Sequence, residues 1–380
     1  MKAYKINEIA YKRILGRNVD GAGEKDGPLA LFWGASALEV NVKSNEVWIQ
    51  VSSDYDLYES WLRIEVNGAE VGRFMVCKDQ PQWMCIARGL NKEKENLISI
   101  IKDTQPMSGD KKHLLLIHQL GLDDDGSFCK PLPRELSLEF VGDSITSGEG
   151  LAGNPNEQDW ITQWFCAGKT YAVQLAKQLN ADYSVMSQCG WGLCWGWNGD
   201  RNAALPLHYE NVCSVLDGDI QKQLGAKDRY SFKKEQDYII INLGTNDNGA
   251  FFQPPWKDAD GKEYVLKTDA YEKACEEDGS FIAASAKKFL QKIRSYNKKA
   301  VIIWCYGMID MQAIPDFIAR GIDEYKAEAH DEKVYLLKLD SMEYLEELPE
   351  DKGSRGHPGP KTHKMAAEKL YKFIKDINLS

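Results

Sequence analysis

The period of the hydrophobic residues changes once along the chain, near Leu136. Before this point apolar and polar residues alternate, which places apolar side chains on one face of a half-buried strand. The clearest alternating runs are Leu38–Val42, Val47–Val51 and Leu62–Val66. After Leu136, short apolar runs are separated by helix-like segments. The change of period predicts two structural regions of different class.

The N-terminal region is predicted to be an antiparallel β-sandwich. Asn67-Gly68 separates Leu62–Val66 from Val71–Val76, and this dipeptide is a strong hairpin signal. Two more apolar runs, Leu97–Ile101 and Leu114–Ile117, follow, and little of the region has a helical period. Several strands with one apolar face are expected to pack as two sheets.

The C-terminal region is predicted to be α/β, with a mainly parallel sheet covered by helices on both faces. The predicted strands are Ser137–Val141, Tyr183–Met186, Tyr238–Leu243, Val301–Tyr306 and Val334–Leu337. The predicted helices are Thr170–Leu179, Phe281–Tyr296, Phe317–His330 and Lys361–Ile377. The acidic and then proline-rich stretch from Asp123 to Pro133 is predicted to be a linker, giving domains 1–133 and 134–380.

The richest motif of the chain follows the first strand of the α/β region. Residues 140–148 read Phe-Val-Gly-Asp-Ser-Ile-Thr-Ser-Gly, so a buried strand ends in a glycine turn that presents Ser144. Gly190 and Asn246 also lie just past predicted strands, and His357 opens the C-terminal helix. Because ligands bind at the carboxyl ends of strands in open α/β sheets, these four residues are expected to converge.

These residue types can hydrolyse an ester. A histidine base activates a serine hydroxyl, and N–H donors stabilise the oxyanion of the tetrahedral intermediate. We therefore assign Ser144 as nucleophile and His357 as base, with an oxyanion hole from the Ser144 and Gly190 N–H groups and the Asn246 amide. Taken singly, each segment could be an ordinary turn or helix cap.

The four blocks resemble the SGNH (GDSL-like) hydrolase superfamily, named for these four residue types. From about residue 28 to 375 the chain resembles carbohydrate esterase family 2, through Phe32–Ser36, Phe140–Gly148, Gly244–Asp247 and Val301–Met308. The resemblance implies a jelly-roll-like sandwich followed by a flavodoxin-like SGNH domain. It also implies a serine esterase that removes O-acetyl groups from plant oligosaccharides or polysaccharides through an acetyl-enzyme.

One position departs from the superfamily pattern, which usually has Asp three residues before the histidine. Here that position is Ser354, and the nearest acid, Asp351, lies six residues before His357. Either a backbone carbonyl orients the imidazole or an acid arrives from elsewhere in the chain. Some family members lack the acid and work with a Ser–His dyad, which fits Ser354. For Asp351 two hypotheses stay open: it is the third catalytic residue, or it is a solvated acid in a loop.

Tryptophans cluster near the predicted site. Five of the eleven fall within residues 160–197, and exposed indoles offer flat faces to sugar rings. Trp191 directly follows Gly190, and Trp256 lies in a loop insertion after Asn246. These two are the predicted substrate-binding residues, although a core position is the ordinary place for any single tryptophan.

Bulk composition argues against several partners. The net charge of −10 argues against long-range attraction to nucleic acid or an anionic membrane. No Cys and His cluster has zinc-ligand spacing, so neither metal nor other cofactor is expected. The nine cysteines include no C-x-x-C pair and no leader peptide is visible, so a cytoplasmic protein with reduced thiols is expected.

Two other functions stay open from the sequence. The first is an acyl-ester or thioester hydrolase for lipid-like, non-sugar substrates, which would need an apolar acyl groove. The second belongs to a different class: a catalytically weak carbohydrate-binding protein on an esterase scaffold. The missing acid before His357 favours the second, whereas the intact Ser144, Asn246 and His357 argue against it.

Overall fold

The computed structural model describes residues 1–18, 27–78, 80–342 and 351–379. The chain divides into two compact units that interleave along the sequence. Unit 1 comprises Met1–Arg134, Trp160–Gly168 and Glu210–Tyr230, and unit 2 comprises Glu135–Asp159, Lys169–Tyr209 and Ser231–Ser380. Two segments of the predicted second domain, residues 160–168 and 210–230, thus belong to the compact unit of the sandwich.

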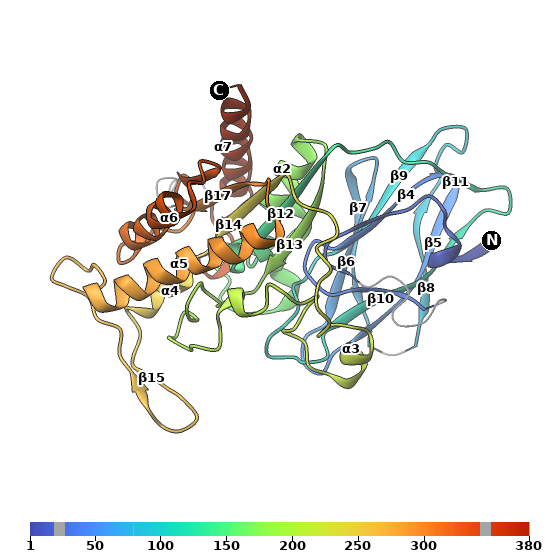
Figure 1. The fold of residues 1–380 in the computed structure, drawn as a ribbon. Helices are drawn as coiled ribbons and strands as arrows, with labels where there is room; N and C mark the ends of the chain where they lie inside the picture. Colours follow the sequence, from blue (N-terminus) through green and yellow to red (C-terminus); the bar gives the residue numbers. More distant parts are fainter. Residues whose placement is uncertain (19–26, 79, 343–350, 380) are drawn as a thin grey trace. The chain divides into compact units, whose positions relative to one another are not determined.

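Unit 1 is built on two antiparallel sheets (Figure 1). One sheet has the order β1 (Lys2–Lys5), β10 (Leu114–Leu122), β5 (Glu46–Asp54) and β8 (Gln82–Arg88), with β3 (Leu29–Leu31) also paired to β10. The other has the order β11 (Ser127–Cys129), β4 (Ala37–Lys43), β9 (Asn96–Lys102), β6 (Ser60–Val66) and β7 (Ala69–Val76), with β2 (Arg13–Leu15) paired to β4. Inward-facing residues of both sheets form one buried cluster. The predicted β-sandwich is confirmed.

Local turn chemistry accounts for the β6–β7 hairpin, while the predicted linker is partly wrong. Asn67 and Gly68 both have positive φ, 52° and 83°, as the hairpin prediction required.

Within the predicted linker, residues 127–129 form β11 and pair with residues 41–43 of β4. The acidic run before β11 makes a turn, with the Gly126 N–H donating to the Asp123 carbonyl at 2.9 Å. That turn brings the chain back to the edge of the sheet.

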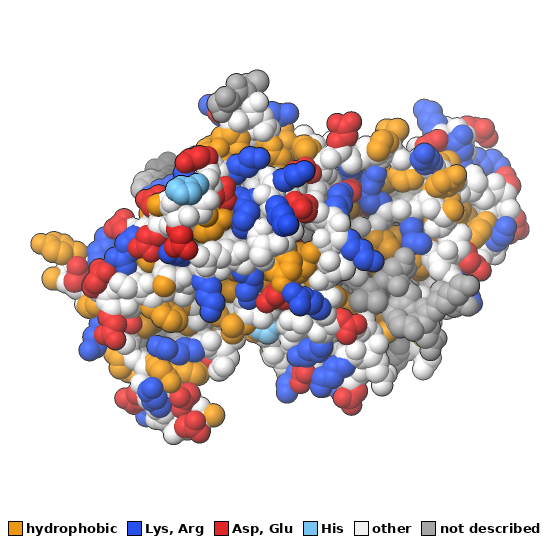
Figure 2. Space-filling model, viewed as in Figure 1, with side chains coloured by type: hydrophobic (Ala, Val, Ile, Leu, Met, Phe, Trp, Pro, Cys, Tyr) orange, Lys and Arg blue, Asp and Glu red, His pale blue; other side chains and the backbone are white. Residues whose placement is uncertain are grey.

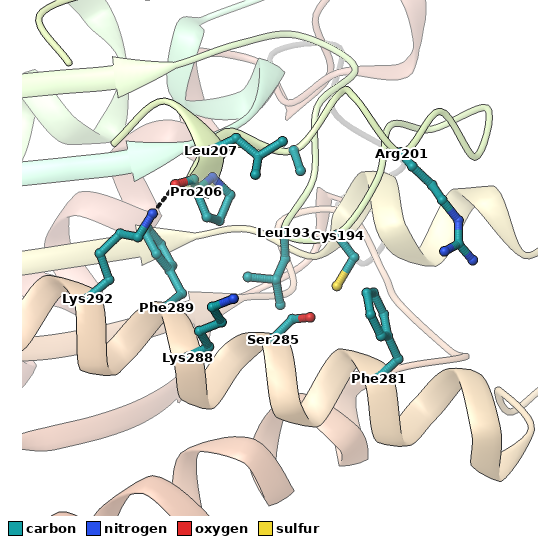
Figure 3. Close-up of a pocket in the computed structure, with 11 residues that line it drawn as sticks. Leu193, Cys194, Arg201, Pro206, Leu207, Phe281, Ser285, Lys288, Phe289 and Lys292 are labelled. Atoms are coloured by element: carbon teal, nitrogen blue, oxygen red, sulfur yellow. Dashed lines mark hydrogen bonds between the residues drawn. The ribbon is translucent and has the colours of Figure 1, made fainter. Parts of the chain in front are cut away.

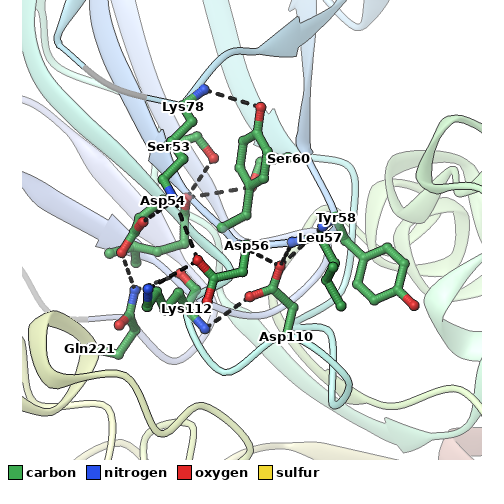
Figure 4. Close-up of polar contacts among 12 residues, drawn as sticks. Ser53, Asp54, Asp56, Leu57, Tyr58, Ser60, Lys78, Asp110, Lys112 and Gln221 are labelled. Carbon is green, nitrogen blue, oxygen red and sulfur yellow. Dashed lines mark hydrogen bonds and ion pairs between the residues drawn. The ribbon is translucent and has the colours of Figure 1, made fainter.

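Polar contacts explain why residues 210–230 belong to unit 1. The Gln221 amide donates to the Lys112 carbonyl at 2.5 Å and to the Asp54 carboxylate at 3.2 Å (Figure 4). The Trp33 indole N–H donates to the Val212 carbonyl at 2.6 Å. These partners are more than 100 residues apart in sequence, so no local pattern reveals them.

Unit 2 contains a five-stranded parallel sheet in the order β13 (Ala181–Ser187), β12 (Leu136–Gly142), β14 (Tyr238–Asn242), β17 (Val301–Tyr306) and β18 (Val334–Lys338). All five predicted strands are present. The chain moves from β12 to β13 in one direction and to β14 and beyond in the other. Right-handed crossovers then put the connecting helices on opposite faces of the sheet. The predicted α/β class and flavodoxin-like SGNH sheet are confirmed.

The four longer helices of unit 2 lie at the predicted positions, and the largest difference in a boundary is at the start of α5. They are α2 (Tyr171–Gln178), α5 (Glu276–Tyr296), α6 (Pro315–Ala329) and α7 (Pro360–Leu379); α2 packs with α7 and α5 packs with α6. Helix α5 begins five residues before the predicted Phe281. Its extra first turn carries Glu276, Glu277 and Asp278, acids that stabilise the positive end of the helix dipole.

The sheet order fixes the position of the site. Strand β12 lies between β13 and β14, so the loops that follow these three strands are neighbours at the carboxyl edge. This is the point at which the strand order reverses, where open α/β sheets bind ligands. Among the helices of the described ranges, none is long and apolar enough to cross a membrane.

Candidate active site

A tight turn after β12 presents Ser144. The Asp143 carboxylate caps the short helix α1 (Ser144–Ser147) by accepting the Ile145 N–H at 3.0 Å. At Gly142 an added Cβ would lie 2.0 Å from the Thr146 hydroxyl oxygen, so only glycine fits this close turn. Helix α1 ends at Gly148, whose φ is 74°. Burial raises the pKa of Asp143 to about 7.

His357 is hydrogen-bonded to Ser144. The distance from His357 Nε2 to Ser144 Oγ is 2.9 Å, and the distance from His357 Nδ1 to the Arg355 carbonyl oxygen is 3.1 Å. A carbonyl only accepts, so Nδ1 carries the proton of the neutral ring. The lone pair on Nε2 then accepts the serine O–H. The structure therefore brings together the two residues assigned from sequence, with a backbone carbonyl orienting the imidazole.

The loop that carries His357 is joined to the segment after the serine turn. The Ser354 N–H donates to the Gly150 carbonyl at 2.9 Å, and the Arg355 N–H donates to the Glu157 carbonyl at 3.0 Å. At Gly150, with φ of 73°, an added Cβ would lie 2.4 Å from the Ser354 carbonyl oxygen. Arg355 has a φ of 56°, a left-handed conformation that aims its carbonyl at the imidazole.

A carboxylate that the sequence analysis missed lies beside the imidazole. The Glu149 side chain is only 7% exposed, and its Oε2 lies 3.5 Å from His357 Nε2. Its Oε1 lies 3.5 Å from Arg355 Nε. One signal was available in the sequence: Glu149 stands between Gly148 and Gly150 directly after the serine motif. Two glycines with positive φ allow the chain to turn a glutamate inward.

Asp351 makes other contacts. Its carboxylate is fully buried, and Oδ1 lies 3.5 Å from Lys361 Nζ at the start of α7. Its backbone carbonyl accepts the Thr362 hydroxyl at 2.7 Å and the Gly359 N–H at 2.8 Å. Within the part of the chain that is described, its carboxylate oxygens accept no hydrogen bond. The structure does not bring this acid to the His357 ring.

The two other predicted oxyanion residues follow the strands that flank β12. Gly190 follows β13 and has a φ of 73°; its carbonyl accepts the Trp197 N–H at 2.9 Å. Asn246 lies on α4 (Thr245–Ala250) after β14, and its amide donates to the Trp191 carbonyl at 2.9 Å. The Asn246 amide therefore contacts the residue next to Gly190. Both residues therefore lie beyond the strands next to β12, and their role in an oxyanion hole stays a prediction.

Asp247, also missed as a functional residue, fixes the Gly190 loop relative to Asn246. Its fully buried carboxylate accepts the N–H groups of Leu193 and Cys194, both at 2.7 Å, and of Trp195 at 3.2 Å. Burial raises the pKa of Asp247 to about 6, although the three donors oppose this shift. An added Cβ at Gly192 would lie 2.3 Å from Asp247 Oδ2. The carboxylate and the loop therefore fit each other closely.

The tryptophans divide into packed and exposed groups. Trp195 is 1% exposed, whereas Trp191 is partly exposed and packs 4.8 Å from the His208 ring. Trp256 forms part of the β15–β16 hairpin (Trp256–Lys257 with Glu263–Tyr264), 5.5 Å from the Tyr264 ring. The structure adds Trp197, which is 53% exposed and whose Cδ1 lies 3.0 Å from where a Gly190 Cβ would stand.

Residues 140–365 match the GDSL-like Lipase/Acylhydrolase family. The chain belongs to this family. The matched range contains the Ser144, Gly190, Asn246 and His357 segments, so the resemblance seen in the sequence is confirmed. No group of three or more His, Cys, Asp or Glu side chains in the described ranges is arranged to hold a metal ion.

Solved structures and curated proteins are similar to the chain. An acetyl xylan esterase, Est2A, from the rumen bacterium Butyrivibrio proteoclasticus is 36% identical, with 99% of each chain covered and a TM-score of 0.91. A family two carbohydrate esterase from Clostridium thermocellum has the same fold at 21% identity, 96% and 98% coverage and a TM-score of 0.76. The cellulase/esterase CelE of Acetivibrio thermocellus is 26% identical over 90% of this chain and 37% of its own length. The chain spans about two fifths of the length of the curated relatives that it matches.

Proposed function

We propose that the protein is a serine esterase that removes O-acetyl groups from carbohydrates. The observation that carries the proposal is the 2.9 Å contact between Ser144 Oγ and His357 Nε2, just past a strand that lies between those preceding Gly190 and Asn246. The likeness to an acetyl xylan esterase along 99% of both chains supports an acetylated sugar as substrate.

The first half of the reaction forms an acetyl-enzyme. His357 Nε2 takes the Ser144 proton as the oxygen attacks the acetyl carbonyl carbon. The N–H groups of Ser144 and Gly190 and the Asn246 amide stabilise the negative oxygen of the intermediate. When the intermediate collapses, the C–O bond to the sugar breaks and His357 returns its proton to the departing sugar oxygen.

The second half of the reaction releases acetate. A water molecule gives a proton to His357 and attacks the acetyl carbon, again through a tetrahedral oxyanion held by the same donors. The bond to Ser144 Oγ breaks, and His357 returns the proton to that oxygen. Acetate leaves and the free serine is restored.

The Arg355 carbonyl and the Glu149 carboxylate have separate roles in this scheme. The carbonyl holds the Nδ1 proton and therefore the ring orientation. In the resting state Nε2 has no proton for Glu149. Once Nε2 takes the serine proton, a positive imidazolium lies 3.5 Å from a mostly buried carboxylate, and this attraction stabilises the charged ring.

The substrate is an acetylated plant oligosaccharide or polysaccharide, with the exposed faces of Trp191, Trp197 and Trp256 available to its sugar rings. The test is a chain-length series of 4-nitrophenyl esters run beside acetylated xylan. We expect 4-nitrophenyl acetate to be the best ester and xylan to release acetate. A preference for long acyl chains would instead indicate a lipid-type acyl hydrolase. Sugar binding with no ester turnover would indicate a binding protein.

A further inference from the structure

Unit 2 has a cavity of about 350 Å³ between α5 and the loop of residues 193–207. It is lined by Leu193, Cys194, Arg201, Ala204, Pro206, Leu207, Phe281, Ser285, Lys288, Phe289 and Lys292 (Figure 3). Ser144, His357 and Asn246 are not among the lining residues. Ligand pockets begin at roughly 300 Å³, so this cavity has room for one small ring.

The walls of the cavity are largely apolar. Phe289 and Leu193 are buried side chains that form its inner surface, 2% and 3% exposed. Phe281 and Leu207 are 49% and 63% exposed at its edge. Phe281, Ser285, Lys288 and Lys292 follow helical spacing on α5 and therefore share one face of that helix.

The charge of the cavity is opposite to that of the chain. Its charged lining residues are Arg201, Lys288 and Lys292, and no lining residue is acidic, although the chain has a net charge of −10. Lys292 donates to the Pro206 carbonyl at 2.9 Å (Figure 3). On the face drawn in Figure 2, basic and hydrophobic side chains lie next to one another over α5.

Two of these cations have no carboxylate partner within the described ranges. Arg201 lies over the Tyr264 ring at 4.2 Å and the Phe281 ring at 5.9 Å, and Lys288 makes no ion pair. The neighbouring Lys287, by contrast, pairs with Glu328. A cation next to an apolar surface binds a carboxylate through a charge-assisted hydrogen bond, while the apolar surface packs against the ligand body.

We propose that this cavity binds a carboxylate carried on a single ring. In an acetylated polysaccharide such a group is a uronic acid residue; a free aromatic carboxylate has the same chemistry. The uronic acid source rests on the proposed esterase function, whereas binding of the carboxylate does not.

The cavity and the proposed oxyanion hole share one loop. Gly190 lies in the loop after β13. In the same loop, Leu193 and Cys194 line the cavity, and their N–H groups donate to the Asp247 carboxylate. A uronic acid residue held in the cavity would therefore anchor an acetylated chain beside the loop that supplies the Gly190 N–H. The cavity would select acidic regions of the substrate without taking part in the chemistry.

Direct binding tests the carboxylate. Isothermal titration calorimetry is run with glucuronic acid and benzoate, and with glucose and benzyl alcohol as neutral counterparts. We expect only the carboxylates to bind, with affinity about tenfold weaker in an Arg201→Ala/Lys288→Ala variant. Lys287→Ala is the matched control and should bind like the wild type. Equal binding of the neutral compounds, equal loss in the control, or no binding at all would overturn the proposal.

Steady-state kinetics then distinguish the source of the carboxylate. Acetylated xylo-oligosaccharides with and without glucuronic acid branches are compared in the wild type and the double variant. We expect KM to rise about tenfold for the branched substrate only, with 4-nitrophenyl acetate hydrolysis unchanged. Benzoate binding without this KM effect would overturn the uronic acid source. Wild-type protein inactive on 4-nitrophenyl acetate would refute the esterase function while leaving the calorimetric test intact.

Discussion

Two fully buried aspartates, Asp103 in unit 1 and Asp247 in unit 2, hold their surroundings in different ways. Asp103 accepts hydrogen bonds from Arg63 Nη2 at 2.8 Å, Arg73 Nε at 2.6 Å and the Gly168 N–H at 2.9 Å. Asp247 accepts three backbone N–H groups of one loop. Each of these buried carboxylates thus joins segments that are far apart in the sequence.

The partners decide the sign of the pKa shift. Burial alone would raise the pKa of Asp103, but the two guanidinium groups lower it below its ordinary value. Amide donors do not overcome burial at Asp247, whose pKa is raised to about 6. A paired buried charge thus stays ionised and supports a fold, whereas amides hold a loop at the active site with a carboxylate that can be protonated in mild acid.

The largest expected effect separates chemistry from folding. Ser144→Ala should lower kcat on 4-nitrophenyl acetate by more than about 10³-fold, because no other group supplies the nucleophile. The free energy of unfolding should change by less than about 1 kcal/mol, since the hydroxyl lies in a turn at the edge of the sheet. His357→Ala should be nearly as severe. A Ser144→Ala enzyme with more than about a hundredth of wild-type activity would refute the nucleophile.

The next prediction concerns a residue of unit 1 whose substitution should reduce stability and leave the chemistry unchanged. Asp103→Asn should lower the free energy of unfolding by about 3–5 kcal/mol, because it removes a fully buried carboxylate that pairs with both the buried Arg63 and the partly buried Arg73. Urea denaturation of the whole protein, monitored by tryptophan fluorescence, measures the loss. The kcat per folded molecule should stay at the wild-type value. A fall in kcat with unchanged stability would contradict the structural role assigned to Asp103.

The candidate catalytic segments follow strands in the structure as the sequence predicted, because each signal is local. A strand, a glycine turn and a polar residue stand together in the chain at Ser144, Gly190 and Asn246, and parallel strands bring their carboxyl ends to one edge. Arg63 shows the opposite case. It alternates with Leu62 and Ile64, which predicts a solvent-facing side chain, yet it is 1% exposed and bound to Asp103 from 40 residues away.

The orientation of His357 could not be predicted for a similar reason. Its Nδ1 partner is a backbone carbonyl, which every residue has. The left-handed conformation of Arg355 aims this carbonyl at the ring, and an arginine gives no sequence signal for that conformation, as a glycine or asparagine would. Glu149 reaches the imidazole across more than 200 residues of sequence. Only the three-dimensional fold distinguishes it from the other acids of the chain.

A smaller effect is expected from one oxyanion donor. Asn246→Ala should lower kcat by about 10²–10³-fold with a smaller change in KM, because the amide contacts charge that develops in the transition state. Steady-state kinetics on 4-nitrophenyl acetate separate the two constants. A change confined to KM would mean that Asn246 binds the substrate instead.

The dependence of stability on pH should reveal Asp247. Its folded pKa of about 6 exceeds the ordinary value of 3.8 for an aspartate, so between these pH values the folded state binds more protons than the unfolded state. Its contribution to stability is therefore full below about pH 3.8 and is lost as the pH rises through about 6. Asp103, with a lowered pKa, contributes above pH 3.8 and loses this contribution as the pH falls below that value.

Asp247→Asn isolates this titration. The unfolding free energy of the wild type, measured by urea denaturation, should fall relative to that of the variant as the pH rises from about 4 to about 6. The test is the sign of the change in this stability difference with pH, because all other titrating groups are common to the wild type and the variant. A difference that rises with pH would place the folded pKa of Asp247 below its ordinary value.

The smallest expected effect concerns which acid serves His357. Asp351→Ala should lower kcat less than about tenfold, because its carboxylate lies by Lys361 and Nδ1 already has the Arg355 carbonyl. A carboxylate that oriented the ring would cost about 10³–10⁴-fold. Glu149→Gln is the comparison: it keeps the shape but removes the charge 3.5 Å from Nε2. It should reduce kcat more than Asp351→Ala does.

Steady-state kinetics of the two variants make this last comparison decisive. A thousandfold loss of kcat in Asp351→Ala, with the fold intact by circular dichroism, would replace the dyad by a triad with a shifted acid. A Glu149→Gln enzyme with the wild-type kcat would reduce Glu149 to a structural partner of Arg355.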